Sequence, residues 1–148
     1  MKKDKPIIMI IQETKINSQK MEEIMRIFNI QYAVMGEDAV RTAGGLTVLW
    51  DPQEVHFKNW VSLPQILSGT FGMIGSLEWI LLIGVYGLHL SSERKNFLEN
   101  MKTIRRLFLE MPWIAGGDFN MITTKGEKRG GSKRLDQDME AFGEMIME

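Results

Sequence analysis

Two short polar stretches carry the side chains best suited to chemistry. Gln-Glu-Thr-Lys at 12–15 follows an apolar run at 7–11, and Gly-Asp-Phe-Asn at 117–120 follows another at 113–115. Strand ends are where a rigid sheet can aim side chains into a shared cleft. Glu13 is therefore a candidate site residue, although an acid in this position is commonly just a solvated strand end.

Asp118 and Asn120 form the more specific pair, because residues two apart on an extended backbone point to the same side. A carboxylate and an amide at this spacing can hold a water molecule and a phosphoryl oxygen together. The alternative is an ordinary Asx turn, in which Asp118 bonds to its own backbone. The residues alone leave both interpretations open.

Composition limits the classes of function. The chain has 148 residues, of which 44% are hydrophobic and 25% charged, as in one soluble globular domain. The absence of cysteine excludes a disulfide framework, a thiolate zinc site and a cysteine nucleophile, and with only His56 and His89 a histidine-rich metal centre is excluded too. A net charge of −1 means that nucleic-acid binding must use a local patch.

The elements that must position these residues alternate between strands and helices. No apolar run approaches the about 20 residues that span a bilayer, and no signal peptide is visible, so we expect an intracellular protein without a membrane partner. Period-2 patterns and buried apolar runs predict strands, with an antiparallel meander in the middle, and amphipathic stripes predict helices. The strands are expected at 7–12, 30–35, 46–50, 55–60, 65–74, 77–86 and 113–115, the last stopping at Gly116-Gly117. The helices are expected at 18–29, 93–110 and from Leu135 to the last residues, with Phe28, Phe97, Met101, Met139, Phe142 and Ile146 among their inward residues.

The order of the motifs resembles the endonuclease/exonuclease/phosphatase superfamily. The matching stretches are Gln-Glu-Thr-Lys at 12–15, Gly-Gly at 44–45, Val-Tyr-Gly at 85–87, Pro-Trp at 112–113 and Gly-Gly-Asp-Phe-Asn at 116–120. The sequences of these motifs are most similar to the endonuclease domain of LINE-type (non-LTR) retrotransposons, and the resemblance covers essentially the whole chain. The resemblance implies an α/β fold, namely a two-sheet β-sandwich flanked by helices, as in DNase I.

The resemblance also implies roles for the matching positions. Glu13 is the implied ligand of Mg²⁺, or of Mn²⁺ in its place, and Mg²⁺ needs only one or two carboxylates beside waters and phosphate oxygens. Asp118 is implied to position or deprotonate the attacking water, Asn120 to assist it, and Tyr86 to bond a phosphate oxygen. The reaction would be in-line attack of water on a phosphodiester of DNA, or alternatively RNA, in the nucleus.

A basic loop follows the second motif. Beside the expected cleft such a loop can grip DNA phosphates, whereas a charge cluster alone is more often a solvated surface. Its basic residues are Lys125, Lys128, Arg129, Lys133 and Arg134, against the single acid Glu127.

Departures from the family occur at both ends. The family begins with an Asn-x-Arg-Gly strand and ends with Ser-Asp-His, and neither motif is present. Residues 1–148 are therefore expected to form a partial domain that cleaves weakly or not at all and self-associates through uncovered sheet edges. Leu88 stands where relatives often have proline, and His89 is not expected to replace the missing histidine.

Three other functional hypotheses stay open. The chain could be a phosphatase of the same superfamily that acts on inositol phosphates or lipids. It could be a catalytically inactive remnant that binds nucleic acid or a partner. It could also be a decayed copy without any protein function.

Overall fold

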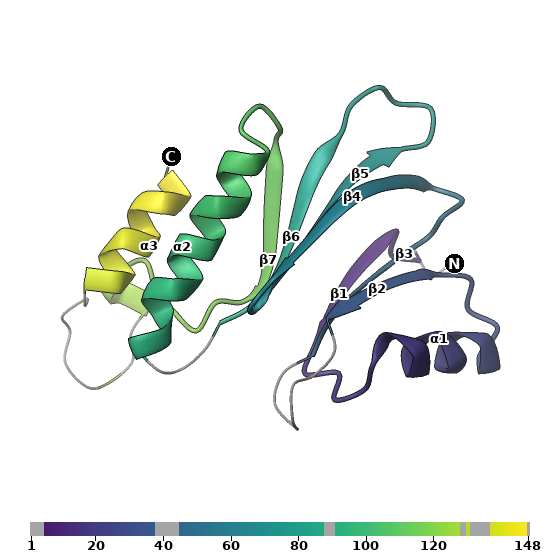
Figure 1. Cartoon of the computed structure of the whole chain (residues 1–148), viewed down its shortest axis with the longest axis horizontal. Helices are drawn as coiled ribbons and strands as arrows, with labels where there is room; N and C mark the ends of the chain where they lie inside the picture. The colour runs from purple at the N-terminus through teal and green to yellow at the C-terminus, as the bar shows by residue number, and fades with distance from the viewer. Residues whose placement is uncertain (1–4, 38–44, 88–90, 128–129, 131–136, 148) are drawn as a thin grey trace.

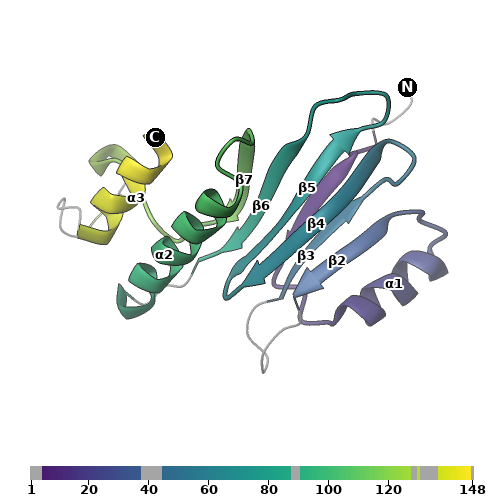
Figure 2. The ribbon, with the colours of Figure 1, turned by 45° about the horizontal axis from the view of Figure 1, so that its top comes forward.

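The computed structural model describes residues 5–37, 45–87, 91–127, 130 and 137–147. Its layers run helix, sheet, sheet, helices (Figures 1 and 2), which confirms the predicted α/β sandwich. One sheet has the order β1-β3-β2, from β1 (Ile8–Gln12), β2 (Ala33–Glu37) and β3 (Leu46–Trp50). The other has the order β4-β5-β6-β7, from β4 (Val55–Leu63), β5 (Ile66–Met73), β6 (Ile80–Tyr86) and β7 (Trp113–Asp118). The helices are α1 (Ser18–Ile27), α2 (Ser91–Leu107) and α3 (Gln137–Met147), with a 3-10 turn η1 (Lys125–Glu127).

The connectivity brings the carboxyl ends of β6 and β7 to one edge. Strands β4, β5 and β6 form the predicted antiparallel meander, while β3 belongs to the other sheet. The chain leaves β6, crosses over through α2 and returns as β7, parallel to β6, with Tyr86 opposite Asp118. A parallel pair needs such a crossover, and its strands end at the same edge.

The core between the two sheets is built around three aromatic rings. Trp50 lies 4.7 Å from Phe57 and 5.5 Å from Phe71, measured between ring centroids. Burying these large rings on facing sheets contributes much of the apolar free energy of folding. The buried residues of this cluster are Met35, Leu46, Val48, Trp50, Val55, Leu67, Phe71 and Leu82.

A second core lies where α2 and α3 cover the outer face of the four-stranded sheet. The sheet supplies Ile66, Leu81, Ile83 and Val85, and the helices supply Phe97, Leu98, Met101, Ile104, Phe142 and Met145. Ile146, predicted to face inward, is 44% exposed, and Met145 takes that place instead. Phe142 is buried as predicted, and the buried stripe continues three residues later at Met145 rather than four residues later at Ile146.

Two predicted boundaries are wrong for identifiable reasons. Helix α1 ends at Ile27, and Phe28 is its C-cap with an exposed side chain rather than a core residue. Strand β7 does not stop at its glycines but runs through Gly116 and Gly117 to Asp118. Glycine is a common strand breaker, yet here the close approach of neighbouring atoms requires it inside the strand.

A β-bulge in β4 reverses which side of the strand faces the core. The register with β5 shifts between Lys58 and Trp60, and Asn59 between them has a φ of 51°. Before the bulge, Phe57 packs towards the three-stranded sheet, whereas after it Val61 packs towards the helices. Strict period 2 would keep Phe57 and Val61 on the same face, so the bulge is what moves Val61 to the opposite one.

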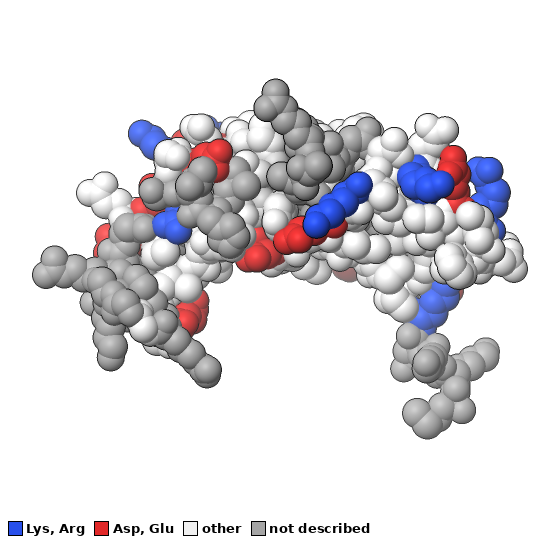
Figure 3. Space-filling model, turned by 90° about the horizontal axis from the view of Figure 1, so that it is seen from below, with Lys and Arg blue, Asp and Glu red and all other residues white. Residues whose placement is uncertain are grey.

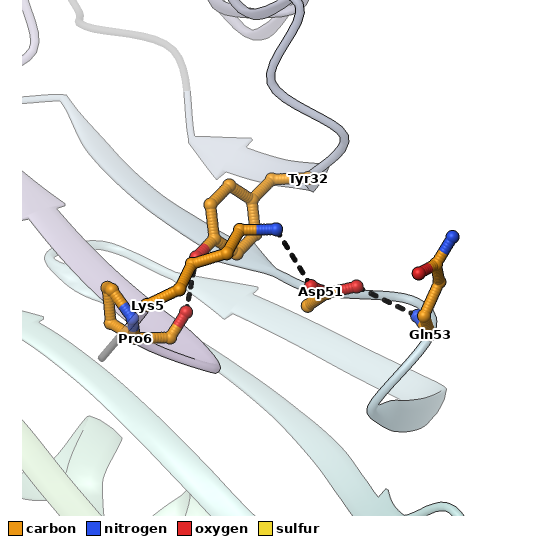
Figure 4. A network of polar contacts seen from close by, with 5 residues as sticks. All are labelled: Lys5, Pro6, Tyr32, Asp51 and Gln53. Carbon is orange, nitrogen blue, oxygen red and sulfur yellow. Dashed lines mark hydrogen bonds and ion pairs between the residues drawn. The ribbon is translucent and has the colours of Figure 1, made fainter. Parts of the chain in front are cut away.

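A polar network fixes the start of β1 against the other edge of its sheet (Figure 4). Lys5 Nζ lies 2.8 Å from Asp51 Oδ2, and the backbone N–H of Gln53 donates to Asp51 Oδ1 at 3.0 Å. The Tyr32 hydroxyl donates to the Pro6 carbonyl, and Lys5 lies over the Tyr32 ring. These contacts set the direction in which β1 enters the sheet and hence where it ends.

No helix in the described ranges has the length and apolar character to cross a membrane.

Candidate active site

The site is built at the point where β1, β6 and β7 end. Tyr86 is the last residue of β6 and pairs in register with Asp118, the last residue of β7, while Glu13 directly follows β1. The Tyr86 hydroxyl donates a hydrogen bond of 2.9 Å to Glu13 Oε1, across the gap between the two sheets. Figure 3 views this end of the molecule and shows acidic side chains near the middle of the face, with a basic side chain beside them.

Gln12 fastens the two sheets together beside these groups. Its side-chain amide donates to the Val85 carbonyl, one residue before Tyr86. The amide fits there because Gly117 has no side chain, since a Cβ on Gly117 would lie 2.7 Å from Gln12 Nε2 and 2.0 Å from the Val85 oxygen. Gly117 also has a φ of 139°, which L-residues avoid. Gln12 and Gly117 therefore fix the spacing between Glu13 and Tyr86.

Asp118 and Asn120 close a turn that matches the Asx alternative. The backbone N–H of Asn120 donates to Asp118 Oδ1 at 2.9 Å. The Asn120 side-chain amide donates to the Gly87 carbonyl at 2.6 Å, and the Gly87 N–H donates to the Asp118 carbonyl at 2.6 Å. Among the described residues nothing bonds Asp118 Oδ2, so one oxygen of this exposed carboxylate holds the turn and the other is left for a ligand.

Phe119 anchors this turn in the helix-side core. Its ring lies 6.4 Å from the Phe97 ring and 5.1 Å from the Phe142 ring, between centroids. Such tilted and edge-on pairs contribute about 0.5–1.5 kcal/mol beyond the area they bury. The aromatic residue between Asp118 and Asn120 thus points inward while its polar neighbours point out.

Strained backbone concentrates in the same place. Glu13, Lys15 and Asn120 have φ values of 52°, 51° and 50°, in the left-handed region that residues with a side chain seldom adopt. Each such residue costs on the order of 1 kcal/mol or more and persists only where the surrounding contacts determine it. Both polar stretches singled out in the sequence therefore adopt conformations that position side chains at the expense of stability.

The electrostatics of the site keep Tyr86 protonated. The hydrogen bond to Glu13 raises the pKa of Tyr86 above its usual value, and partial burial and the negative charges of Glu13 and Asp118 act in the same direction. Tyr86 is therefore a neutral hydroxyl donor near pH 7, held among carboxylates.

The donor set fits a hard divalent cation. Glu13 and Asp118 are both exposed and both act on the Tyr86 hydroxyl, and Mg²⁺ takes one or two carboxylates while keeping several waters. No cluster of three or more His, Asp or Glu side chains occurs within the described parts of the chain, so a cage made entirely of protein ligands does not form there.

Several predicted residues fall outside the part of the chain that the structure describes. Lys128, Arg129, Lys133 and Arg134 lie outside it, as do Leu88 and His89, and of Lys125 only the backbone in η1 is described. Their predicted roles stay predictions. The acid of this loop folds back, because Glu127 accepts hydrogen bonds from the hydroxyls of Thr123 at 2.8 Å and Thr124 at 3.0 Å.

Comparison with solved structures identifies the architecture. The human Nocturnin catalytic domain with bound sulfate anion matches with a TM-score of 0.58 and 12% identity, over 78% of this chain and 52% of that one. The D. rerio TDP2 complexed with single strand DNA product matches with a TM-score of 0.54 and 12% identity, over 78% and 48%. A functionally unknown conserved protein from Enterococcus faecalis matches with a TM-score of 0.54 and 18% identity, over 77% and 52%.

This is the endonuclease/exonuclease/phosphatase fold. At these identities the likeness establishes the fold alone, and the chain spans about half the length of these solved chains. By sequence, no protein-family model and no curated protein matches. Within the fold, the four predicted residues Glu13, Tyr86, Asp118 and Asn120 come together at the ends of β1, β6 and β7.

Sequence reasoning missed the residues that hold this site in place. Gln12 and Gly87 both belong to the matching motifs, but the sequence pattern predicts no role for either. A Cβ on Gly87 would lie 2.1 Å from the Phe119 carbonyl oxygen, so the Asp118 turn can pack against it only because it is glycine. Two signals were available in the sequence. Gln12 is a polar amide at the end of an apolar strand, and Gly87 directly follows Tyr86.

Proposed function

We propose that this chain is a metal-dependent phosphodiesterase domain that cuts nucleic acid, of the endonuclease kind and derived from a non-LTR retrotransposon. The observation that carries the proposal is the hydrogen bond between Tyr86 and Glu13, with Asp118 in register beside Tyr86, at adjoining strand ends. The fold is shared with TDP2, one structure of which is complexed with single strand DNA product. The wording of the two motifs at 12–15 and 117–120 supports the retrotransposon origin, with which a nuclear location agrees.

The residues divide the work in a way that their geometry supports. Glu13 would hold the divalent cation, which when bound supplies positive charge against the charge that develops on the phosphoryl oxygens. Asp118 Oδ2, left outside the Asx turn, orients a water and accepts its proton as the water oxygen bonds to phosphorus. The phosphorus–oxygen bond to the leaving group breaks on the opposite side.

Tyr86 and Asn120 serve the phosphate in this scheme. Tyr86 keeps its proton, so its hydroxyl can donate to a phosphoryl oxygen when a substrate offers one in place of Glu13. Asn120 uses its amide N–H group on the Gly87 carbonyl, which leaves its side-chain oxygen to accept a bond from the attacking water. The Asn120 amide is already held by the protein before any substrate arrives, whereas the Tyr86 hydroxyl exchanges its bond to Glu13 for one to the phosphate.

The decisive experiment compares Asp118→Asn and Glu13→Gln with the wild-type chain on supercoiled plasmid and on single-stranded oligonucleotides, with Mg²⁺ and with chelator. Glu22→Gln, on the exposed face of α1, is the matched control. We expect Mg²⁺-dependent cutting that falls at least about 100-fold in both site variants and is unchanged in the control. The expectation of weak cutting by this chain is tested by the absolute rate.

Other outcomes would select another function. Release of phosphate from inositol phosphates without any nicking would establish the phosphatase hypothesis. Salt-dependent DNA binding without cutting at any Mg²⁺ concentration would establish the binding remnant. Cutting that is equally strong in Asp118→Asn and the wild type would refute the assignment of the site.

A further inference from the structure

An apolar groove lies at the end of the molecule opposite the candidate active site. It has a volume of about 580 Å³ and is formed by the β5–β6 loop on one side and by the end of α2 with the following turn on the other. In Figure 1 both segments lie at the top, whereas Tyr86 and Asp118 end their strands at the bottom. The groove is therefore independent of the proposed function.

The groove exposes large apolar side chains. Leu77 is 98% exposed, and Leu107 and Leu109 on the other wall are 60% and 71% exposed. Single exposed leucines are ordinary, but several around one concavity mark an interaction surface. Leu77 is exposed at the edge of the groove. The same surface therefore carries an apolar side chain that can insert and a groove that can accept the Leu77 of another copy.

The charges at the groove are also self-complementary. Arg106 and Glu110 both line it, and within the described residues neither takes part in an ion pair. A two-fold axis makes residue i of one copy meet residue j of the other and residue j meet residue i. Because Arg106 and Glu110 lie on the same face, a two-fold axis through the groove brings opposite charges of the two copies to one interface.

We propose that this groove is the interface of a symmetric dimer, in which a second copy of this chain inserts its Leu77 and pairs its Glu110 with Arg106. The exposed leucines and the two opposite charges of the groove support a second copy as its occupant.

A charge-swap cycle tests this pairing. The dissociation constant of the dimer is measured by sedimentation for the wild type, Arg106→Glu, Glu110→Arg and the double swap. Each single swap sets like charges against each other and is expected to weaken the dimer at least about tenfold, and the double swap to restore it. Arg26→Glu, an exposed position on α1, is the matched control and should leave the constant unchanged.

A second variant separates this face from the edge of the sheet. Leu77→Asp is expected to give monomers, whereas Ile114→Lys on the edge strand β7 leaves the dimer intact, and far-UV circular dichroism confirms that both are folded. A wild-type chain that is monomeric at about 100 μM, far above the Kd of a specific dimer, would overturn the proposal. So would a dimer that persists in Leu77→Asp but dissociates in Ile114→Lys, or single swaps without effect.

Discussion

Replacing Gly117 by alanine should damage this protein severely, while the same change at the adjacent Gly116 should not. Gly117 has a φ of 139°, and its Cβ would lie 2.0 Å from the Val85 oxygen and 2.7 Å from Gln12 Nε2. Gly116 has no such constraint, because the nearest atom to its Cβ is the flexible end of the Ile10 side chain, at 3.2 Å. The pair therefore separates backbone strain at the site from the general effect of adding a methyl group to β7.

The magnitude follows from two contributions. An alanine at this φ costs about 1–3 kcal/mol. Ordinary contact begins near 3.4 Å, so β7 must also move away from β6, and overpacking of this kind costs a further 1–3 kcal/mol or so. The sum of about 2–6 kcal/mol is a large part of the 5–15 kcal/mol that stabilises a typical domain. Gly116→Ala should change the free energy of unfolding by no more than about 1 kcal/mol.

Thermal and urea unfolding, both followed by tryptophan fluorescence, measure the two variants. We expect Gly117→Ala to lower the melting temperature by roughly 5–20 °C, at about 2–4 °C per kcal/mol for a chain near this size. Its nicking rate should fall further than its folded fraction, since a shift of about 1 Å at a site can cost 100-fold. Equal unfolding midpoints for Gly117→Ala and Gly116→Ala would refute the geometric reasoning.

Three further predictions follow from other contacts. Tyr86→Phe removes the hydroxyl that orients Glu13, so calorimetry should show a Mg²⁺ affinity lowered by about tenfold or more, and an unchanged affinity would contradict this orienting role. The bond to Lys5 holds the pKa of Asp51 below its usual value, so this carboxylate stabilises the fold near pH 7 and loses that effect as the pH falls below about 4. Asp51→Asn should accordingly be less stable than the wild type at pH 7, and the two should converge as the pH falls below the lowered pKa of Asp51. Phe142 is 3% exposed, and Phe142→Ala should cost about 3–5 kcal/mol in urea unfolding, whereas a loss below about 1 kcal/mol would mean that α3 does not pack as described.

The order of strands and helices could be predicted because it depends on local periodicity. The apolar run before Gln12 is typical of a strand that is covered on both faces. The stripe of Phe97, Met101 and Ile104 is the one face that helix α2 buries. The end of β7 could not be predicted in the same way. The glycines after Ala115 predict the end of the strand. In the structure, Gly117 is glycine because the Val85 carbonyl of the neighbouring strand lies against it, and the local sequence does not show that contact.

Assignment of strands to sheets also exceeded what pattern could provide. Strand β3 and the meander are adjacent in the sequence with only a short turn at Asp51 between them, yet they belong to different sheets. At the bulge around Asn59, the Lys58 carbonyl accepts a hydrogen bond from the Thr70 hydroxyl of β5. Both features are decided by which residues meet across the sandwich, and a pattern of alternation carries no such information.

The candidate site shows most clearly how the local and the distant depend on each other. From the sequence, an Asx turn and a catalytic carboxylate are alternatives for Asp118. In the structure the turn forms with only one of the two carboxylate oxygens. Oδ1 accepts the Asn120 N–H at 2.9 Å, while Oδ2 makes no hydrogen bond to any described residue. An asparagine at 118 could still accept that bond, so Asp118→Asn removes the charge while keeping the turn, whereas Asp118→Ala removes both. A difference in stability between these two variants measures the turn, and an equal loss of cutting in both would place the chemistry on the charge of Oδ2 rather than on the shape of the loop.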